Sequence, residues 1–220
     1  MLQTWPTYEE TRFRRSVRHQ ATAKIGPSAV LQLASAMRNL GLNFLIPPIF
    51  ADAGIANWLV APPSDDIEAQ RATRAHHALR ANLPPAVAAF VLAEAGRLTA
   101  DELLAHHVPK AVQAALRHLP AALAARLLAE AIKLHGWAFA GAGRVRVSGW
   151  RYLMIEIEGN PLCAGENADH PVCAWHAAMF ERLFDAVAPG QLRVVEVGCE
   201  ARGDSACRFI VEPAPSVRPL

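Results

Sequence analysis

VVEVGCEARGDSACRFIVE, residues 194–212, is the segment most informative about the fold. Its two ends are rich in valine and isoleucine, which favour strands, and EARGDS between them is typical of a turn. The pattern predicts a hairpin of strands 192–199 and 206–212. If the hairpin is symmetric, Cys199 and Cys207 lie opposite each other with Cβ atoms about 4.5–5.5 Å apart.

The last third of the chain, which has only four cysteines in all, contains three thiols and one carboxylate close together in sequence. They are Cys173, Glu196, Cys199 and Cys207. Thiolates set close together suit a tetrahedral zinc ion, and a zinc closed by four protein ligands is structural rather than catalytic. Two other interpretations stay open. The cysteines are inert buried thiols, or Cys199 and Cys207 form a disulfide.

The fourth zinc ligand also stays open. Glu196 lies three residues before Cys199, and in a regular strand these two side chains face opposite sides. A bulge at Gly198 would turn them together. Without that bulge, Cys163 is the better fourth ligand. Cys173 begins a predicted helix whose 3- and 4-residue spacing of apolar side chains puts it on the core side.

These motifs, E-x-x-C-x7-C-x-F with a Cys-x-Trp helix upstream, resemble the vinyl-4-reductase domain family over roughly residues 144–212. Its relatives include the effector-sensing domains of phenol-responsive bacterial regulators and, more distantly, subunits of the TRAPP tethering complex. The resemblance implies the NO-signalling/Golgi-transport ligand-binding type of α+β fold. It also implies a zinc held by Cys173, Glu196, Cys199 and Cys207, from which the additional Cys163 departs.

Within that family, the chain length, the helical first half and the segments NPLC and PVCAWH resemble the stand-alone members of bacteriochlorophyll biosynthesis. Those members are named for reducing a vinyl group of a chlorophyll precursor. The resemblance therefore implies a tetrapyrrole ligand, other enzymes of the same pathway as partners, and a homodimer.

Vinyl reduction requires a hydride source, and the sequence offers no recognisable site for one. GAGRVR at 141–146 lacks the last glycine of a dinucleotide fingerprint and follows a helix. A closed zinc site has no open position for a substrate. We therefore favour a tetrapyrrole-binding carrier over an NAD(P)H-dependent 4-vinyl reductase, with a small-ligand sensor as the third interpretation.

Rings and charged side chains of the central region are the candidates for ligand contact. Aromatic rings can sandwich a planar macrocycle, a histidine on an apolar helix face can bind its magnesium, and guanidinium groups pair with carboxylates. The same residues equally suit a core and a charged strand surface. The candidates are His135, Trp137, Phe139, Arg144, Arg146, Trp150, Tyr152, His176 and Phe180.

Composition fits one compact domain, since 220 residues with 52% hydrophobic side chains can bury a sizeable core. The net charge of +2 and the lack of a basic block argue against nucleic-acid binding. We expect a basic polar arm at 1–24, a single domain at 25–212 and a frayed proline-rich tail at 213–220. The arm has no apolar leader run, which indicates a cytoplasmic protein, and contact of the arm with a membrane surface is the sharper alternative.

The first half favours helices and the second half strands, which predicts an α+β fold with a helical N-terminal half packed on an antiparallel sheet. The apolar run 41–60 is broken by Pro47 and Pro48, so we expect a buried helix-turn-helix or pocket wall and no transmembrane segment. The expected helices cover 27–40, 66–83, a capping-box helix from Thr99-x-x-Glu102 to Pro109, and two more from Pro109 and Pro120 to about 140.

Overall fold

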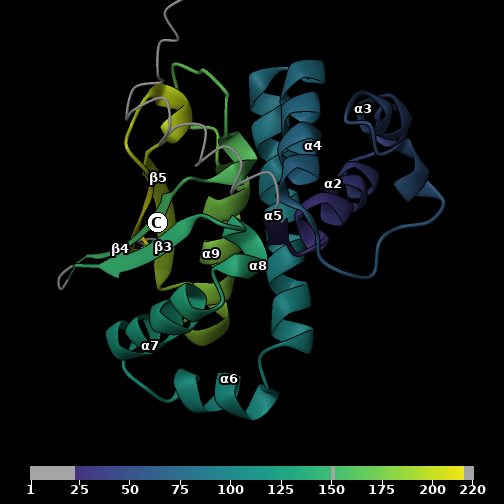
Figure 1. Ribbon diagram of the computed structural model, residues 1–220. Helices are drawn as coiled ribbons and strands as arrows, with labels where there is room; N and C mark the ends of the chain where they lie inside the picture. Colours follow the sequence, from purple (N-terminus) through teal and green to yellow (C-terminus); the bar gives the residue numbers. More distant parts are fainter. Residues whose placement is uncertain (1–22, 150–151, 216–220) are drawn as a thin grey trace, which may run out of the picture.

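The computed structural model describes residues 23–149 and 152–215. Figure 1 shows the helices gathered beside a four-stranded antiparallel sheet of order β3-β4-β6-β5. The strands are β3 (Arg144–Ser148), β4 (Leu153–Glu158), β5 (Leu192–Gly198) and β6 (Cys207–Pro213). This arrangement confirms the α+β prediction with an antiparallel sheet.

Helix α9 lies against the sheet and α5 packs along α9, so the core is shared by the helical half and the sheet. The helices are α2 (Ser28–Asn39), α3 (Ile46–Asp52), α4 (Ala69–Asn82), α5 (Pro85–His106), α6 (Lys110–Arg117), α7 (Ala121–Leu134), α8 (Trp137–Ala140) and α9 (Ala174–Val187). Short 3-10 turns are η1 (Asn43–Leu45), η2 (Ala56–Leu59), η3 (Pro161–Cys163) and η4 (Glu200–Arg202).

The decisive hairpin is confirmed. β5 and β6 pair antiparallel, and η4 and Gly203 connect them. Gly203 has a φ of 89°, a left-handed conformation that glycine adopts without the Cβ clash other residues suffer. The register shifts between Glu196 and Gly198, which is the bulge considered for this strand. Glu196, at the bulge, accepts a hydrogen bond from the Cys173 backbone N–H at the start of α9.

The capping box predicted at Thr99 is wrong. α5 runs unbroken from Pro85 to His106, and Thr99 is buried in its middle. The Thr99 hydroxyl donates to the Ala95 carbonyl at 2.9 Å, the usual bond of a threonine inside a helix. Capping needs free backbone N–H groups, and inside a continuing helix these are already bonded.

Other boundaries also differ from the sequence prediction. The helix expected to reach 140 ends at Leu134, and a turn at Gly136 separates it from α8. Lys24, assigned to the basic arm, pairs with Glu68 in a two-stranded sheet of β1 (Lys24–Ile25) and β2 (Ile67–Glu68) that was not predicted. The helix expected at 66–83 starts only at Ala69, because Ile67 and Glu68 form β2. Pro213, assigned to the frayed tail, is the last residue of β6, and residues 1–22 and 216–220 lie outside the described residues.

The run 41–60 forms η1, α3 and η2, so it is helical as predicted, but it is only partly buried, since Phe44 and Val60 are 72% and 90% exposed. Ile49, Phe50 and Trp58 are its buried anchors. Among the described residues, no helix is both long enough and apolar enough to cross a bilayer.

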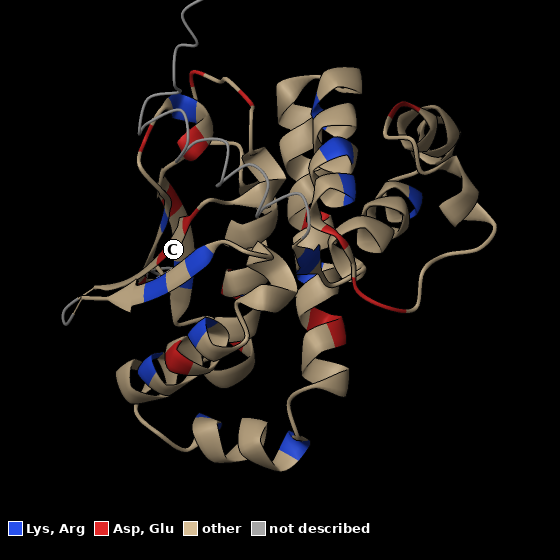
Figure 2. Ribbon diagram, viewed as in Figure 1, with Lys and Arg blue, Asp and Glu red and all other residues tan. Residues whose placement is uncertain are grey.

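Charges on the sheet are paired rather than segregated. Arg146 bonds Glu158 at 3.2 Å, and Arg208 bonds Glu156 at 2.9 Å. Figure 2 shows basic and acidic segments interspersed over the ribbon. In the view shown, the described chain therefore presents mixed charge and no continuous basic stripe of the kind that tracks nucleic acid.

Candidate metal centre

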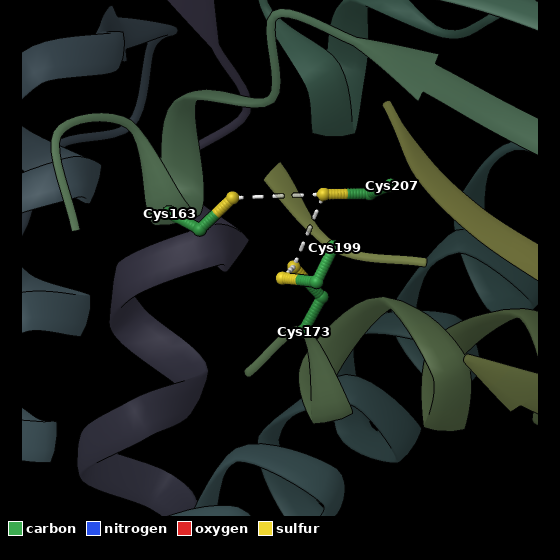
Figure 3. Close-up of side chains that lie close together, drawn as sticks. All are labelled: Cys163, Cys173, Cys199 and Cys207. Carbon is green, nitrogen blue, oxygen red and sulfur yellow. Dashed lines mark hydrogen bonds between the residues drawn. The ribbon is translucent and has the colours of Figure 1, made fainter. Parts of the chain in front are cut away.

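Four buried thiols from four separate segments meet at one point (Figure 3). Cys163 ends η3, Cys173 precedes the first turn of α9, Cys199 follows β5 and Cys207 begins β6. All four sulfurs lie within 4.8 Å of one another. Cys207 Sγ is 3.6 Å from the sulfurs of both Cys163 and Cys173, and the Cys173–Cys199 separation is 3.8 Å.

These separations match a tetrahedral metal site. Sulfurs about 2.3 Å from a central zinc ion stand about 3.8 Å apart at the corners of a tetrahedron. All four cysteines are free thiols in the structure, so the ligand atoms are available. Four soft sulfurs in a closed, buried arrangement are the donor set that selects zinc or an iron–sulfur type of centre.

Mutual hydrogen bonds divide the protons unequally among the thiols. Hydrogen bonds from the other three thiols lower the pKa of Cys199. Hydrogen bonds with Cys163, Cys199 and Cys207, followed by burial, raise the pKa of Cys173. In such a cluster one sulfur is ionised while its neighbours keep their protons. A metal cation that replaces the shared protons is expected to stabilise it.

Glu196 lies beside the cluster but is not one of the four grouped donors. Its Oε2 accepts a hydrogen bond from the Cys173 backbone N–H at 2.8 Å. Its Oε1 is buried without a hydrogen-bond partner among the described residues. Burial, followed by the nearby Cys199, raises the pKa of Glu196 to about 9. Of the two candidates for a fourth ligand, the Cys163 sulfur is the one that the fold places with the other three.

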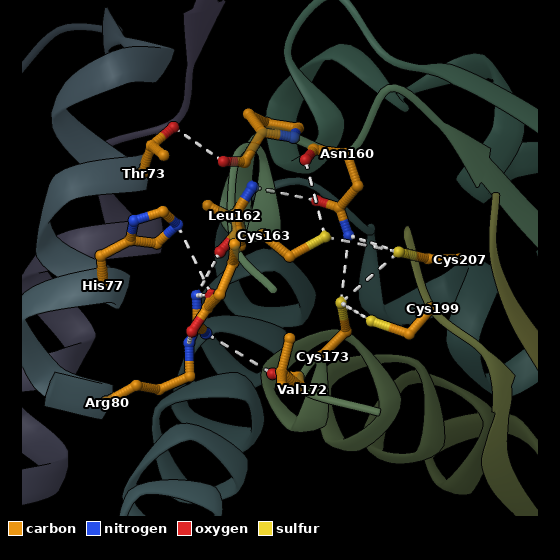
Figure 4. Close-up of polar contacts among 12 residues, drawn as sticks. Thr73, His77, Arg80, Asn160, Leu162, Cys163, Val172, Cys173, Cys199 and Cys207 are labelled. Carbon is orange, nitrogen blue, oxygen red and sulfur yellow. Dashed lines mark hydrogen bonds and ion pairs between the residues drawn. The ribbon is translucent and has the colours of Figure 1, made fainter. Parts of the chain in front are cut away.

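Asn160 contacts the cysteine cluster, a role that the sequence analysis did not predict (Figure 4). It is fully buried, and its Nδ2 donates to Cys173 Sγ at 3.3 Å and to Cys207 Sγ at 3.4 Å. Its Oδ1 accepts from the Leu162 N–H at 3.0 Å, which fixes the amide orientation. The only sequence signal is its place directly before the NPLC proline, and that pattern alone does not reveal an N–H···S donor.

Replacing Asn160 by leucine is expected to destabilise the fold by about 2 kcal/mol, because the Leu162 N–H and the two sulfurs lose their buried partner. Zinc affinity is expected to fall about tenfold or more, the usual cost of removing a group that orients metal ligands. Urea unfolding and a competition titration with a chelator measure the two effects. The exposed Asn57 gives the control variant Asn57→Leu, and equal zinc affinity in both variants would contradict the role of Asn160.

Arg80 ties the cysteine-bearing loop to α4 (Figure 4). Its Nε donates to Glu166 at 2.7 Å, and its guanidinium also donates to the Leu162 carbonyl at 2.7 Å and the Val172 carbonyl at 3.5 Å. The Arg80 side chain is only 12% exposed. The segment between Cys163 and Cys173 is therefore held at both ends by one cation.

Replacing Arg80 by methionine is expected to lower the free energy of unfolding by about 3 kcal/mol. The change leaves the Glu166 carboxylate largely buried without its main partner, which is the costly way to break such a pair. Chemical denaturation measures the loss. The second variant, Arg80→Met with Glu166→Gln, should recover part of it, and a double variant no more stable than the single one would count against the ion-pair explanation.

Three of the predicted ligand-contact residues meet in the core. The His176 ring lies 6.0 Å from Phe180 and 6.1 Å from Phe139, and its Nε2 lies 3.1 Å from the Phe139 carbonyl oxygen. All three residues are buried. Burial lowers the pKa of His176 to about 4, so the ring is neutral at pH 7. These residues pack against one another.

The remaining predicted ligand-contact residues lie apart from that core group. His135 is exposed at the end of α7, where its Nδ1 contacts the Ala131 carbonyl at 2.9 Å, so the buried helix face predicted for it is wrong. Trp137 and Tyr152 are 52% and 53% exposed. Arg144 and Arg146 on β3 both face Glu158. Trp150 lies outside the described residues.

A cavity of about 600 Å³ opens beside the cysteine loop. It lies between the start of α5 and residues 166–174, so its lining includes Val172 and Ala174, the neighbours of Cys173. None of the predicted ligand-contact residues that the structure describes lines it.

Comparison with known proteins places the chain among characterised sequences. The model of the vinyl-4-reductase domain matches residues 153–213, the part that carries all four cysteines and the strands β4, β5 and β6. The bacteriochlorophyll synthase 23 kDa chain of Cereibacter sphaeroides is 42% identical over 193 residues, covering 86% of this chain and 91% of the relative. The protein of the same name from Rhodobacter capsulatus is 38% identical and covers 86% and 87%.

The fold also matches a solved structure of the H-NOX family, described in work on heme distortion, with a TM-score of 0.54. The match covers 89% of this chain and all of that chain, at 14% sequence identity. At that identity the likeness concerns the fold alone, and it confirms the predicted NO-signalling type of architecture.

Proposed function

The chain belongs to the family of the bacteriochlorophyll synthase 23 kDa chains, and from that premise we propose that it is a tetrapyrrole-binding carrier stabilised by a structural zinc ion. Membership supports a role in bacteriochlorophyll biosynthesis. The carrier activity and the zinc ion are the parts of the proposal that family membership alone does not establish. The observation that carries them is a closed four-sulfur site set beside an open, largely apolar cavity.

The zinc ion would be held by Cys163, Cys173, Cys199 and Cys207. Bound there, it would supply a cross-link between η3, the start of α9 and the β5–β6 hairpin, in addition to the packing of α9 on the sheet. Four protein sulfurs leave no coordination position for a substrate or a water molecule. The residues of the site therefore support the fold, and the ligand is bound elsewhere.

A carrier needs a site that takes up a flat apolar pigment and releases it. The cavity has a volume within the range of about 300–1,000 Å³ typical of small-molecule sites. The sequence offers no dinucleotide fingerprint, so binding without reduction is the simpler activity for these residues. Enzymes that supply and accept chlorophyll precursors are then the expected partners.

The test is a spectrum. The purified chain mixed with protochlorophyllide is expected to show a red-shifted Soret band and quenched tryptophan fluorescence. Addition of NADPH should then leave the vinyl absorbance unchanged. Turnover by pure protein with NADPH would show a 4-vinyl reductase instead, and an unshifted spectrum with unquenched fluorescence would exclude the carrier. Light scattering of the same sample decides whether the chain is the homodimer that we also propose.

A further inference from the structure

The cavity beside the loop between Cys163 and Cys173 has a wall made largely of small side chains. The first turns of α5 contribute small residues, and the facing segment contributes Pro171 and Ala174. Val172 and Leu92 also line the cavity. The α5 residues of this wall are Pro85, Ala86, Ala88 and Ala89. Side chains that end at Cβ form a smooth surface, on which a flat ring system can lie in contact over its whole face.

His170 stands at the rim of this cavity. Its Nδ1 lies 2.6 Å from Asp169 Oδ1. Its side chain is 56% exposed, and its Nε2 has no hydrogen-bond partner among the described residues. The Asp169 carboxylate, which is 95% exposed, favours without fixing the tautomer that carries the proton on Nδ1 and a lone pair on Nε2, the arrangement that metal-binding histidines use.

We propose that this cavity is the tetrapyrrole site and that His170 Nε2 binds the central magnesium of the pigment. The proposal rests on the carrier function and names its site. The alanine wall of α5 contacts one face of the macrocycle, and His170, on the facing segment, approaches the magnesium from the other face. The open side of the cavity leaves the edge of the ring accessible to the enzyme that receives the pigment.

The floor of the cavity explains why an apolar ring is accepted there. Arg80 and Glu166 line it as an ion pair, and the Arg80 guanidinium also donates to the Leu162 carbonyl. A neutral ring face therefore covers no unpaired charge, which would be costly to remove from water. The described residues offer no free cation in this floor, so carboxylate groups of the pigment extend toward solvent.

The same geometry links the pigment site to the four thiols. Val172 and Ala174 line the cavity, and Cys173 between them belongs to the cluster. The metal would hold this wall at its distance from α5. Removal of the metal is therefore expected to weaken pigment binding without any contact between metal and pigment.

The experiment compares protochlorophyllide with its magnesium-free form, using binding titrations followed by absorbance. His170→Ala should raise the dissociation constant for the magnesium form about tenfold, and leave that for the magnesium-free form unchanged. Ala89→Phe, which fills an exposed part of the wall, should raise both about tenfold or more. The exposed His118 gives the control His118→Ala, which should bind both forms like the wild type.

The outcomes separate this site from the carrier function itself. If the wild type binds the pigment and both cavity variants bind it equally well, the site is elsewhere and the carrier function stands. If Ala89→Phe weakens binding but His170→Ala affects the two forms alike, the axial-ligand role is wrong. If the wild type binds neither form, the carrier function fails and this proposal fails with it. Circular dichroism of each variant confirms that it is folded.

Discussion

Cys207→Ser is expected to abolish tight zinc binding and to lower the melting temperature by about 10 °C or more. Its sulfur is 3.6 Å from those of Cys163 and Cys173, and it belongs to the strand that joins β4 to β5. Its removal opens the cross-link between the sheet and the start of α9. For a chain of this size, such a shift corresponds to a loss of about 4 kcal/mol.

Elemental analysis and a thermal melt of the same sample measure the two effects together. Wild-type protein stripped with a chelator should melt like Cys207→Ser, since structural metal binding is coupled to folding. Complete metal loss with an unaltered melting curve would reject the structural role. A zinc content of zero in the wild type would reject the site itself.

The fourth ligand is decided by two further variants. Cys163→Ser is expected to lose zinc as Cys207→Ser does. Glu196→Gln is expected to keep one zinc ion per chain, because the Glu196 carboxylate bonds the Cys173 amide rather than completing the group of sulfurs. The reverse result, with zinc kept in Cys163→Ser and lost in Glu196→Gln, would establish the ligand set implied by the family resemblance.

The second large effect is expected at Gly96, where α5 crosses α9. A Cβ atom built at Gly96 would lie 2.2 Å from the carbonyl oxygen of Trp175 and 3.1 Å from the Met179 nitrogen. Both atoms belong to the backbone of α9, so no side-chain rotation relieves the contact. Gly96→Val is therefore expected to cost about 4 kcal/mol, above the usual range for overpacking because two helices must separate.

Helix propensity works in the opposite direction, since glycine inside a helix costs about 1 kcal/mol relative to alanine. The exposed Ala105 on the same helix measures that contribution through Ala105→Gly. Urea unfolding of both variants gives the comparison. A Gly96→Val protein as stable as the wild type would show that α5 and α9 do not meet at this point.

The periodicity of apolar residues along the chain correctly predicted much of the local structure. The Val-rich segments around EARGDS formed the predicted hairpin, and the spacing of Cys173, His176 and Phe180 placed all three on the buried face of α9. The capping box was predicted wrongly because Thr99 and Glu102 have the capping-box spacing, and the same spacing also occurs inside a helix where the threonine is buried. The β1–β2 pair left no signal, since two-residue strands are too short for an alternating pattern.

The residue pattern was enough to place thiol ligands at the end of a hairpin and the start of a helix, because strand and helix periods fix which way each side chain faces. The folded chain was needed to show that Cys163 joins these thiols and that Asn160 and Arg80 bond to the groups around them. Those contacts link segments far apart in the chain, and no local period records such a distance. The cavity could not be predicted for the same reason, since its two walls come from α5 and from residues 166–174, which are far apart in the chain.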